Sequence, residues 1–361
     1  MLHPMHERYA DLLVSYCMRV EEGDTVLIEV GAEATPIARA LVRATLRAGG
    51  EPSLRLTYPE QLADVLELAP DAFWDRPPTL ELAEIERVQA YVRVDAPHNT
   101  HALEGIDPAR IARHVRRRAP VQAHRLSSTR WVGTLYPTAA AAQGAGMRLD
   151  DFERFVYGAM YLFDDDPVAR WAEQRALQAT LIERLARASR VRIVAEGTDL
   201  TLGVTGRHWV NSDGRKNMPS GEVFTGPIED SAEGTITFDL PSSVDGVVVR
   251  DVRLTFAGGK VVAASAAAGE STLLAKLDAD AGARFLGELG IGTNRAIQRP
   301  ILHTLFDEKI GGTVHLALGR SYAETGGTNE SAIHWDLITD LRRGGAIELD
   351  GDPFLVDGRF V

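Results

Sequence analysis

The chain has 361 residues, of which 45% are hydrophobic and 25% are charged, and its formal net charge is −12. This length and composition predict a globular protein of roughly two domains. The acidic balance argues against a nucleic-acid partner, because phosphates would be repelled.

Two further features bound the setting of the protein. No run of about 18 apolar residues occurs, so no membrane span is expected, and the first residues lack the pattern of a secretory signal. The single cysteine, Cys17, excludes an intramolecular disulfide and a zinc site built from several thiolates. We therefore expect a cytoplasmic protein.

Residues 1–188 are predicted to form a Rossmann-like α/β domain with a parallel sheet. Short β-branched runs predict strands at 25–30, 52–58, 90–95 and 130–136. Helical spacing of apolar residues predicts helices at 34–46 and 61–68, and a further helix capped by Asp107 with Pro108 at its first position. Strands that alternate with helices favour a parallel sheet covered by helices.

A nucleotide site in this domain is not expected. The first strand is followed by Gly31–Thr35, which contains no glycine-rich phosphate loop and includes an acidic residue. The one basic cluster, 114–118, is interpreted as the solvated end of the helix that begins near Pro108, where basic side chains suit the helix dipole.

Residues 189–361 are predicted to form a strand-rich α+β domain that binds metal. Strands are expected at 191–195, 199–204, 234–238 and 246–250, followed by a hairpin over 253–264 that turns at Gly258-Gly259. A helix is expected over 272–286.

Two glutamates in this second domain stand in glycine-containing segments. Glu222 follows a Pro-Ser-Gly loop and leads into an apolar strand, where it is either a turn residue or a functional carboxylate. Glu288 lies among apolar residues and glycines, where a buried carboxylate needs a cation. Glycine capping of a helix end is the alternative interpretation of the Glu288 segment.

Two histidines lie in strand-like runs near acidic residues. His315 follows Asp307 and Glu308 across a Gly-Gly turn, and its alternative interpretation is a hydrogen-bonded core histidine. If 332–338 is a strand, His334 and Asp336 point to one face while the apolar residues between them pack the other. This pair suits metal ligation, and the alternative is a His–Asp hydrogen bond on a sheet surface.

The combined set of three glutamates, two histidines and one aspartate suits zinc, cobalt or manganese. Six candidates exceed what one tetrahedral ion needs, so two ions that share a carboxylate are expected. Neither a zincin H-E-x-x-H motif nor a G-x-S-x-G elbow is present. A zincin and a serine hydrolase are therefore disfavoured, as is a cysteine hydrolase.

At these residues the sequence resembles the aminopeptidase T and aminopeptidase S family of thermophilic metallo-aminopeptidases. The matching segments are 218–224, 288–294, 304–322 and 329–336, and the likeness extends into the first domain. The resemblance implies removal of single N-terminal residues from peptides that have a free N-terminus. It implies two divalent ions per subunit, zinc or cobalt first, with magnesium or manganese as alternatives.

The resemblance also assigns residues and an assembly. It implies that the metal site consists of Glu222, Glu288, Glu308, His315, His334 and Asp336, with Glu288 bridging the ions. Tyr322 matches an active-site tyrosine of the family, and Glu308 is a candidate for either metal ligand or general base. Some members space this glutamate and the following histidine more closely than Glu308 and His315, which are seven apart. A homodimer is implied, in which the first domain of one subunit encloses the site of the other.

The expected chemistry is hydrolysis by a water that two ions activate, with Tyr322 donating a hydrogen bond to the oxyanion. Two alternatives stay open at this point. One is a metal-dependent amidase or esterase that acts on non-peptide substrates. The other is a non-catalytic metal-binding protein of the same fold.

Overall fold

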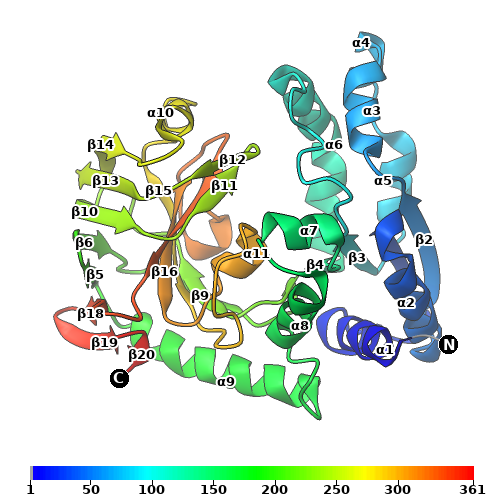
Figure 1. The fold of residues 1–361 in the computed structure, drawn as a ribbon, viewed down its shortest axis with the longest axis horizontal. Coiled ribbons are helices and arrows are strands. Elements are labelled where there is room, and N and C mark those ends of the chain that lie inside the picture. The colour runs from blue at the N-terminus through cyan, green and yellow to red at the C-terminus, as the bar shows by residue number, and fades with distance from the viewer. Residues whose placement is uncertain (1–2) are drawn as a thin grey trace. The chain divides into compact units, whose positions relative to one another are not determined.

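A computed structural model describes residues 3–361. Contacts divide them into two units (Figure 1): one holds the chain up to Val168 together with Gly214–Pro219, and the other holds Ala169–Asp213 and Ser220–Val361. Most of helix α9 (Pro167–Leu185) thus groups with the second unit. A boundary of independently folding domains near residue 188 stays a prediction.

The first unit is built on a five-stranded parallel sheet of order β2-β1-β3-β4-β8. Its strands are β1 (Thr25–Gly31), β2 (Glu51–Thr57), β3 (Ala90–Asp95), β4 (Arg130–Leu135) and β8 (Asn217–Met218). Its helices are α1 (Pro4–Asp11), α2 (Thr35–Arg47), α3 (Gln61–Leu68), α4 (Asp71–Trp74), α5 (Thr79–Ile85), α6 (Pro108–Ser128), α7 (Ala139–Gly144) and α8 (Leu149–Ala159), with a π-helix over Leu12–Cys17. The predicted α/β class with its parallel sheet is confirmed.

Helix α6 corrects the interpretation of the basic cluster. The helix continues past residue 118 and through Pro120 to Ser128, so the predicted helix end was wrong. Packing holds the continued helix, because Val121 is buried in an apolar cluster with Val88 and Tyr91, and the guanidinium carbon of Arg125 lies 4.5 Å from the centroid of the Trp131 ring. Burial of these side chains offsets the one backbone hydrogen bond that a proline inside a helix cannot donate.

The second unit contains two antiparallel sheets. The larger has the order β14-β13-β10-β6-β5-β18-β19-β20 and the smaller the order β17-β16-β15-β9-β7. The larger sheet consists of β5 (Arg190–Ala195), β6 (Thr198–Gly203), β10 (Glu233–Phe238), β13 (Val252–Ala257), β14 (Lys260–Ser265), β18 (Ala346–Leu349), β19 (Asp352–Val356) and β20 (Arg359–Phe360). The smaller consists of β7 (Val210–Ser212), β9 (Glu222–Thr225), β15 (Leu286–Gly292), β16 (Thr313–Gly319) and β17 (His334–Asp340).

The remaining elements of this unit connect the sheets. They are the hairpin β11 (Ser242–Val244) and β12 (Val247–Val249), and the helices α10 (Glu270–Leu277) and α11 (Thr304–Asp307). Gly258 and Gly259 have φ of +56° and +76° and turn β13 into β14, as predicted. Helix α10 ends at Leu277 rather than 286, because Asp280 accepts hydrogen bonds from the backbone of Gly282 and Ala332 and so fixes a loop there. None of the described helices combines the length and apolar character needed to cross a membrane.

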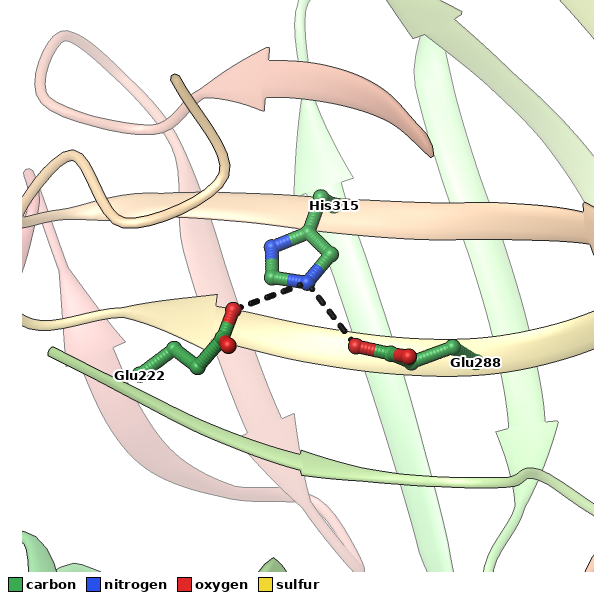
Figure 2. A group of neighbouring side chains, drawn as sticks. All are labelled: Glu222, Glu288 and His315. Atoms are coloured by element: carbon green, nitrogen blue, oxygen red, sulfur yellow. Dashed lines mark hydrogen bonds and ion pairs between the residues drawn. The ribbon is translucent and has the colours of Figure 1, made fainter. Parts of the chain in front are cut away.

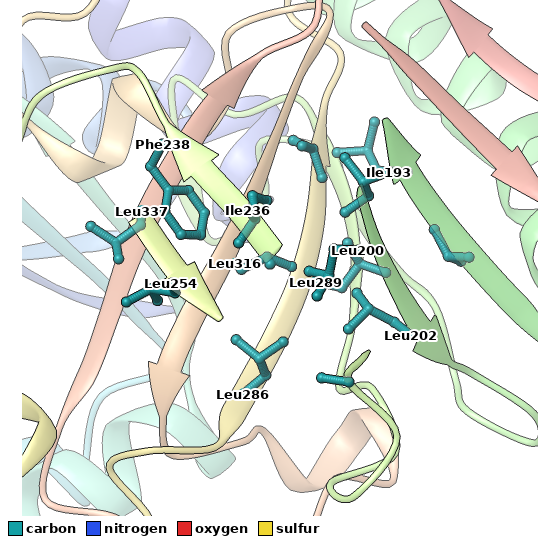
Figure 3. Packing of buried hydrophobic residues seen from close by; sticks show 14 of the residues in the cluster. Ile193, Leu200, Leu202, Ile236, Phe238, Leu254, Leu286, Leu289, Leu316 and Leu337 are labelled. Carbon is teal, nitrogen blue, oxygen red and sulfur yellow. The ribbon is translucent and has the colours of Figure 1, made fainter. Parts of the chain in front are cut away.

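The two sheets pack face to face over one apolar core (Figure 3). Larger-sheet residues in this core include Ile193, Leu200, Leu202, Ile236, Phe238 and Leu254, and smaller-sheet residues include Leu286, Leu289, Leu316 and Leu337. Burying each such side chain contributes about 1.5–3 kcal/mol. Because successive strand residues point to opposite faces, this core sends the alternate residues of the smaller sheet to its other face.

Candidate metal centre

The polar residues of the smaller sheet lie between core residues along each strand. In β9, β15, β16 and β17 the core receives Val223, Leu289, Leu316, Trp335 and Leu337. The alternate positions are Glu222, Glu288, His315, His334 and Asp336. Packing on one face of the sheet therefore aligns five polar side chains on the other.

Strand register brings these side chains together, and one glycine makes room for them. His315 lies opposite Gly290 in the neighbouring strand. A Cβ at Gly290 would stand 2.0 Å from Nε2 of His315. The imidazole thus lies directly over the β15 backbone, a close approach that only glycine permits.

His315 lies between two carboxylates (Figure 2). Its Nε2 is 3.2 Å from Oε1 of Glu288 and 3.4 Å from Oε2 of Glu222. The imidazole is fully buried and both glutamates are nearly so. One ring nitrogen thus faces two acidic groups away from solvent.

His334 extends the cluster to Asp336. Its Nε2 is 3.6 Å from Oε2 of Glu288 and 3.8 Å from Oδ1 of Asp336. Its Nδ1 is 2.7 Å from the carbonyl oxygen of Arg320. Because a carbonyl only accepts hydrogen bonds, Nδ1 carries a proton, and Nε2 is the ring nitrogen directed at the carboxylates, the orientation that metal-ligating histidines have.

Glu308 joins the cluster from the end of α11. Asp307 accepts backbone hydrogen bonds from Ile301 at 2.8 Å and His303 at 3.1 Å, which fixes the short helix. One oxygen each of Glu308 and Asp336 and a nitrogen of His315 lie within 4.8 Å of one another. The seven-residue spacing of Glu308 and His315 therefore does not keep Glu308 out of the cluster.

Lys309 is the one cationic side chain of lysine or arginine type that forms ion pairs with the cluster among the described residues. Its ammonium is fully buried, lies 3.0 Å from Oε1 of Glu222 and also contacts Glu308. The two carboxylates raise the pKa of Lys309 above its usual value although burial opposes this, so the side chain stays charged. Sequence reasoning missed this residue.

Buried side-chain amides form hydrogen bonds to the backbone at and near Glu222. The side chain of Gln178 on α9 donates to the Glu222 carbonyl at 2.9 Å and to Oδ1 of Asn211 at 2.7 Å. The side chain of Asn294 donates to the Ser220 carbonyl at 2.9 Å. These bonds fix the loop before β9 and with it the position of the carboxylate.

The carboxyl groups of the cluster are close together and buried away from solvent, and both effects raise their pKa values. Burial, and then repulsion from Glu222, raises the pKa of Glu288 well above its usual value. Burial raises the pKa of Glu308 to about 7 against the opposing effect of Lys309. Burial followed by repulsion from Glu288 raises the pKa of Asp336 to about 7. Without further cations these acids cannot all be ionised at neutral pH.

The donor atoms fit divalent ions. Three overlapping groups have ligand atoms within 4.8 Å of one another: Glu222–Glu288–His315, Glu288–His334–Asp336 and Glu308–His315–Asp336. Oε2 of Glu222 and Oδ1 of Asp336 are buried and form no hydrogen bond. Such oxygens are costly to bury unless a cation satisfies them. The oxygen and imidazole donors suit zinc or a similar ion.

Tyr322 lies at the edge of the cluster. Its ring centroid is 4.9 Å from that of His334 and 5.8 Å from that of Phe224, and 39% of the residue is exposed. Burial of the hydroxyl, followed by repulsion from Glu288, raises its pKa, so the hydroxyl keeps its proton. The phenol of Tyr322 thus lies against His334 at the edge of the six sequence-predicted ligands.

A buried cluster of four carboxylates and two imidazoles on one face of a sheet defines a metalloenzyme-type centre rather than a surface ion-pair network. The sequence profile of the thermophilic metalloprotease family (M29) matches residues 3–360. The chain belongs to this family of metal-dependent hydrolases, as the sequence resemblance predicted.

Known relatives cover nearly the whole chain. Aminopeptidase 2 of Geobacillus stearothermophilus is 28% identical, over 98% of this chain and 94% of its own. Aminopeptidase T of Thermus aquaticus is 29% identical, over 98% and 95%. The structure of wild-type AmpT from Thermus thermophilus matches with a TM-score of 0.84 and 26% identity over 99% of both chains.

A more distant structure shares the fold. The 2,5-dihydroxypyridine dioxygenase of Pseudomonas putida KT2440 matches with a TM-score of 0.60 and 16% identity, over 99% of this chain and 96% of its own. Its name denotes a different reaction, so the fold alone does not specify the chemistry. Function has to be argued from the site and the family.

Proposed function

We propose that the protein is a metallo-aminopeptidase that hydrolyses the N-terminal residue from peptides. The observation that carries this is the convergence of Glu222, Glu288, Glu308, His315, His334 and Asp336 in three overlapping ligand groups. Family membership and the aminopeptidase relatives supply the substrate class.

Two divalent ions per subunit are part of the proposal, zinc or cobalt first, with magnesium or manganese as alternatives. Glu288 belongs to two of the ligand groups, and its two oxygens face His315 and His334 separately. A carboxylate in that position suits a bridge between two ions. When bound, the ions supply an activated water near neutral pH and polarise the scissile carbonyl.

Two residues are proposed to handle protons and charge. Glu308 accepts the proton of the attacking water if it is not saturated by an ion, and passes it to the leaving amine. Tyr322 donates its hydroxyl proton in a hydrogen bond to the developing oxyanion. The free α-amine of the peptide would bind one of the ions or an acidic side chain of the site, which restricts hydrolysis to the first residue.

We propose that the protein is cytoplasmic and that it forms a homodimer. The single cysteine, which is buried, leaves no intramolecular disulfide that would call for an oxidising compartment. The homodimer rests on the family resemblance. Sedimentation of the active protein tests it, and an active monomer would remove it.

The function is tested with a panel of aminoacyl-p-nitroanilides and with their N-acetylated counterparts. We expect cleavage of the free-amine substrates only, and a loss of at least about a thousandfold in Glu288→Gln and His334→Ala. Glu348→Gln, a carboxylate on β18 that pairs with Arg192, is the matched control and should keep full activity. Equal cleavage of acetylated substrates or of acyl esters would instead favour an amidase or esterase. Turnover at the wild-type rate in both cluster variants would sink the proposal.

A further inference from the structure

The buried cation beside the cluster has a role that the ligand set alone does not explain. Lys309 forms ion pairs with Glu222 and Glu308 and is fully buried. Lysine is rarely buried completely, because its ammonium loses hydration and its flexible side chain loses entropy. A lysine kept in such a place is held there by the carboxylates.

Lys309 pairs with Glu222 and with Glu308, which forms a third ligand group with His315 and Asp336, but it pairs with none of Glu288, His334 and Asp336. We call Glu222–Glu288–His315 the Glu222 position and Glu288–His334–Asp336 the Asp336 position. Within the described part of the chain, the Asp336 position forms no ion pair with any lysine or arginine. At the Glu222 position, the ammonium of Lys309 lies 3.0 Å from Oε1 of Glu222.

This asymmetry affects the two positions differently. Lys309 compensates part of the negative charge that would attract an ion to the Glu222 position, and it repels a cation placed there. Oε2 of Glu222, which accepts no hydrogen bond, is left as the ligand oxygen on that side. At the Asp336 position the carboxylates of Glu288 and Asp336 pair with no lysine or arginine among the described residues, and both face Nε2 of His334.

We propose that Lys309 is a built-in cation that makes the two positions unequal, so that one divalent ion binds tightly at the Asp336 position and the other binds weakly at the Glu222 position. This proposal rests on the two-ion site of the proposed function. It adds that the ion at the Glu222 position is the one that exchanges with ions in solution. Lys309 acts through Glu222 and Glu308, so it is a positioning residue.

The full-length protein, freed of metal, is titrated with Co²⁺ by calorimetry, and its metal content is measured after dialysis. We expect about one ion per chain after dialysis, about two in excess Co²⁺, and dissociation constants at least about tenfold apart. In Lys309→Met the weaker constant should tighten by at least about tenfold while the stronger one stays within about threefold. Lys309→Arg, which keeps the charge, should keep the two constants apart.

Lys276→Met is the matched control, since Lys276 on α10 pairs with Asp245, outside the cluster, and it should bind Co²⁺ as wild type does. Two equal constants in the wild-type protein would overturn the proposal even if Lys309→Met does not fold. An unchanged or weaker second constant in a folded Lys309→Met would overturn it as well. The two proposals fail separately, since aminopeptidase activity with two equal positions rejects only the role of Lys309. Unequal positions without peptide hydrolysis reject only the function.

Discussion

Two cations of this protein, one in each unit, each pair with two carboxylates. In the first unit Arg55 on β2 lies 3.2 Å from Glu29 and also contacts Glu84, and its side chain is 31% exposed. In the second unit Lys309 pairs with Glu222 and Glu308 and is 0% exposed. The pairing is alike, and the surroundings differ.

The difference in solvent exposure distinguishes a metal centre from an ordinary ion pair. Water screens the Arg55 group, where such pairs contribute little to stability. The Lys309 group adjoins two more buried carboxylates, Glu288 and Asp336, so the cluster holds four acids and one ammonium. An excess of buried negative charge of this size calls for added cations, and it marks the position of the metal centre.

The largest expected effect is on the pH dependence of the ion-free protein. The pKa values of Glu308 and Asp336 rise to about 7 in the folded state from usual values of 4.5 and 3.8. The folded state then binds more protons than the unfolded state between about pH 4 and 7, so this stability is present at low pH and is lost as pH rises through about 7. We expect the free energy of unfolding to fall by about 5 kcal/mol between pH 5 and 8, because each of the two groups loses a nearly hundredfold difference in proton affinity and a tenfold difference corresponds to about 1.4 kcal/mol.

Urea unfolding of the chelator-treated protein at several pH values measures this loss. Adding divalent ions back should restore the free energy of unfolding at pH 8, because the ions then neutralise the carboxylates that protons neutralise at pH 5. Asp336→Asn should flatten the pH slope in the ion-free state. Stability that instead increases from pH 5 to 8 would show that the acids have other partners.

Gly290 offers a sharper, purely steric test of the cluster. In Gly290→Ala the new Cβ would meet Nε2 of His315 at 2.0 Å. We expect a destabilisation of about 1–3 kcal/mol and weaker Co²⁺ binding, since the imidazole has to move. Gly133→Ala in β4 is the control, because its Cβ would find its nearest neighbour, Oδ1 of Asn217, at 3.6 Å. Equal Co²⁺ affinity in both variants would mean that the position of His315 is not critical.

Much of the fold could be predicted from the sequence, because the spacing of apolar residues that marks a strand or a helix is a local property of the chain. The strand-borne pair His334 and Asp336 was predicted from alternation with Trp335 and Leu337, and the core confirms that alternation. Alternation failed at β15, where every residue is buried and glycines surround Glu288, so a strand and a capped helix end had the same appearance.

What the sequence missed depends on contacts between distant segments. The extension of α6 through Pro120 depends on the packing of Val121 and Arg125 against aromatic residues of β3 and β4, which a local helix rule does not include. Lys309 follows Glu308 directly in a segment of apolar and glycine residues, and that was the available signal. A lysine is usually exposed, so only the placement of Glu222, 87 residues earlier in the chain, reveals it as an internal cation.

The smallest expected effect belongs to Arg55, and it closes the comparison. Arg55→Met should change the free energy of unfolding by no more than about 1 kcal/mol, because Glu29 and Glu84 remain partly solvated once the guanidinium is gone. The same substitution at Lys309 in the ion-free protein leaves buried carboxylates uncompensated and should cost about 3–5 kcal/mol. Urea unfolding of both variants, with and without Co²⁺, measures the contrast. Added Co²⁺ should recover much of the loss at Lys309 and none at Arg55, because ion binding stabilises only the state that holds the site. Equal losses at the two positions would mean that burial and acid excess do not distinguish them.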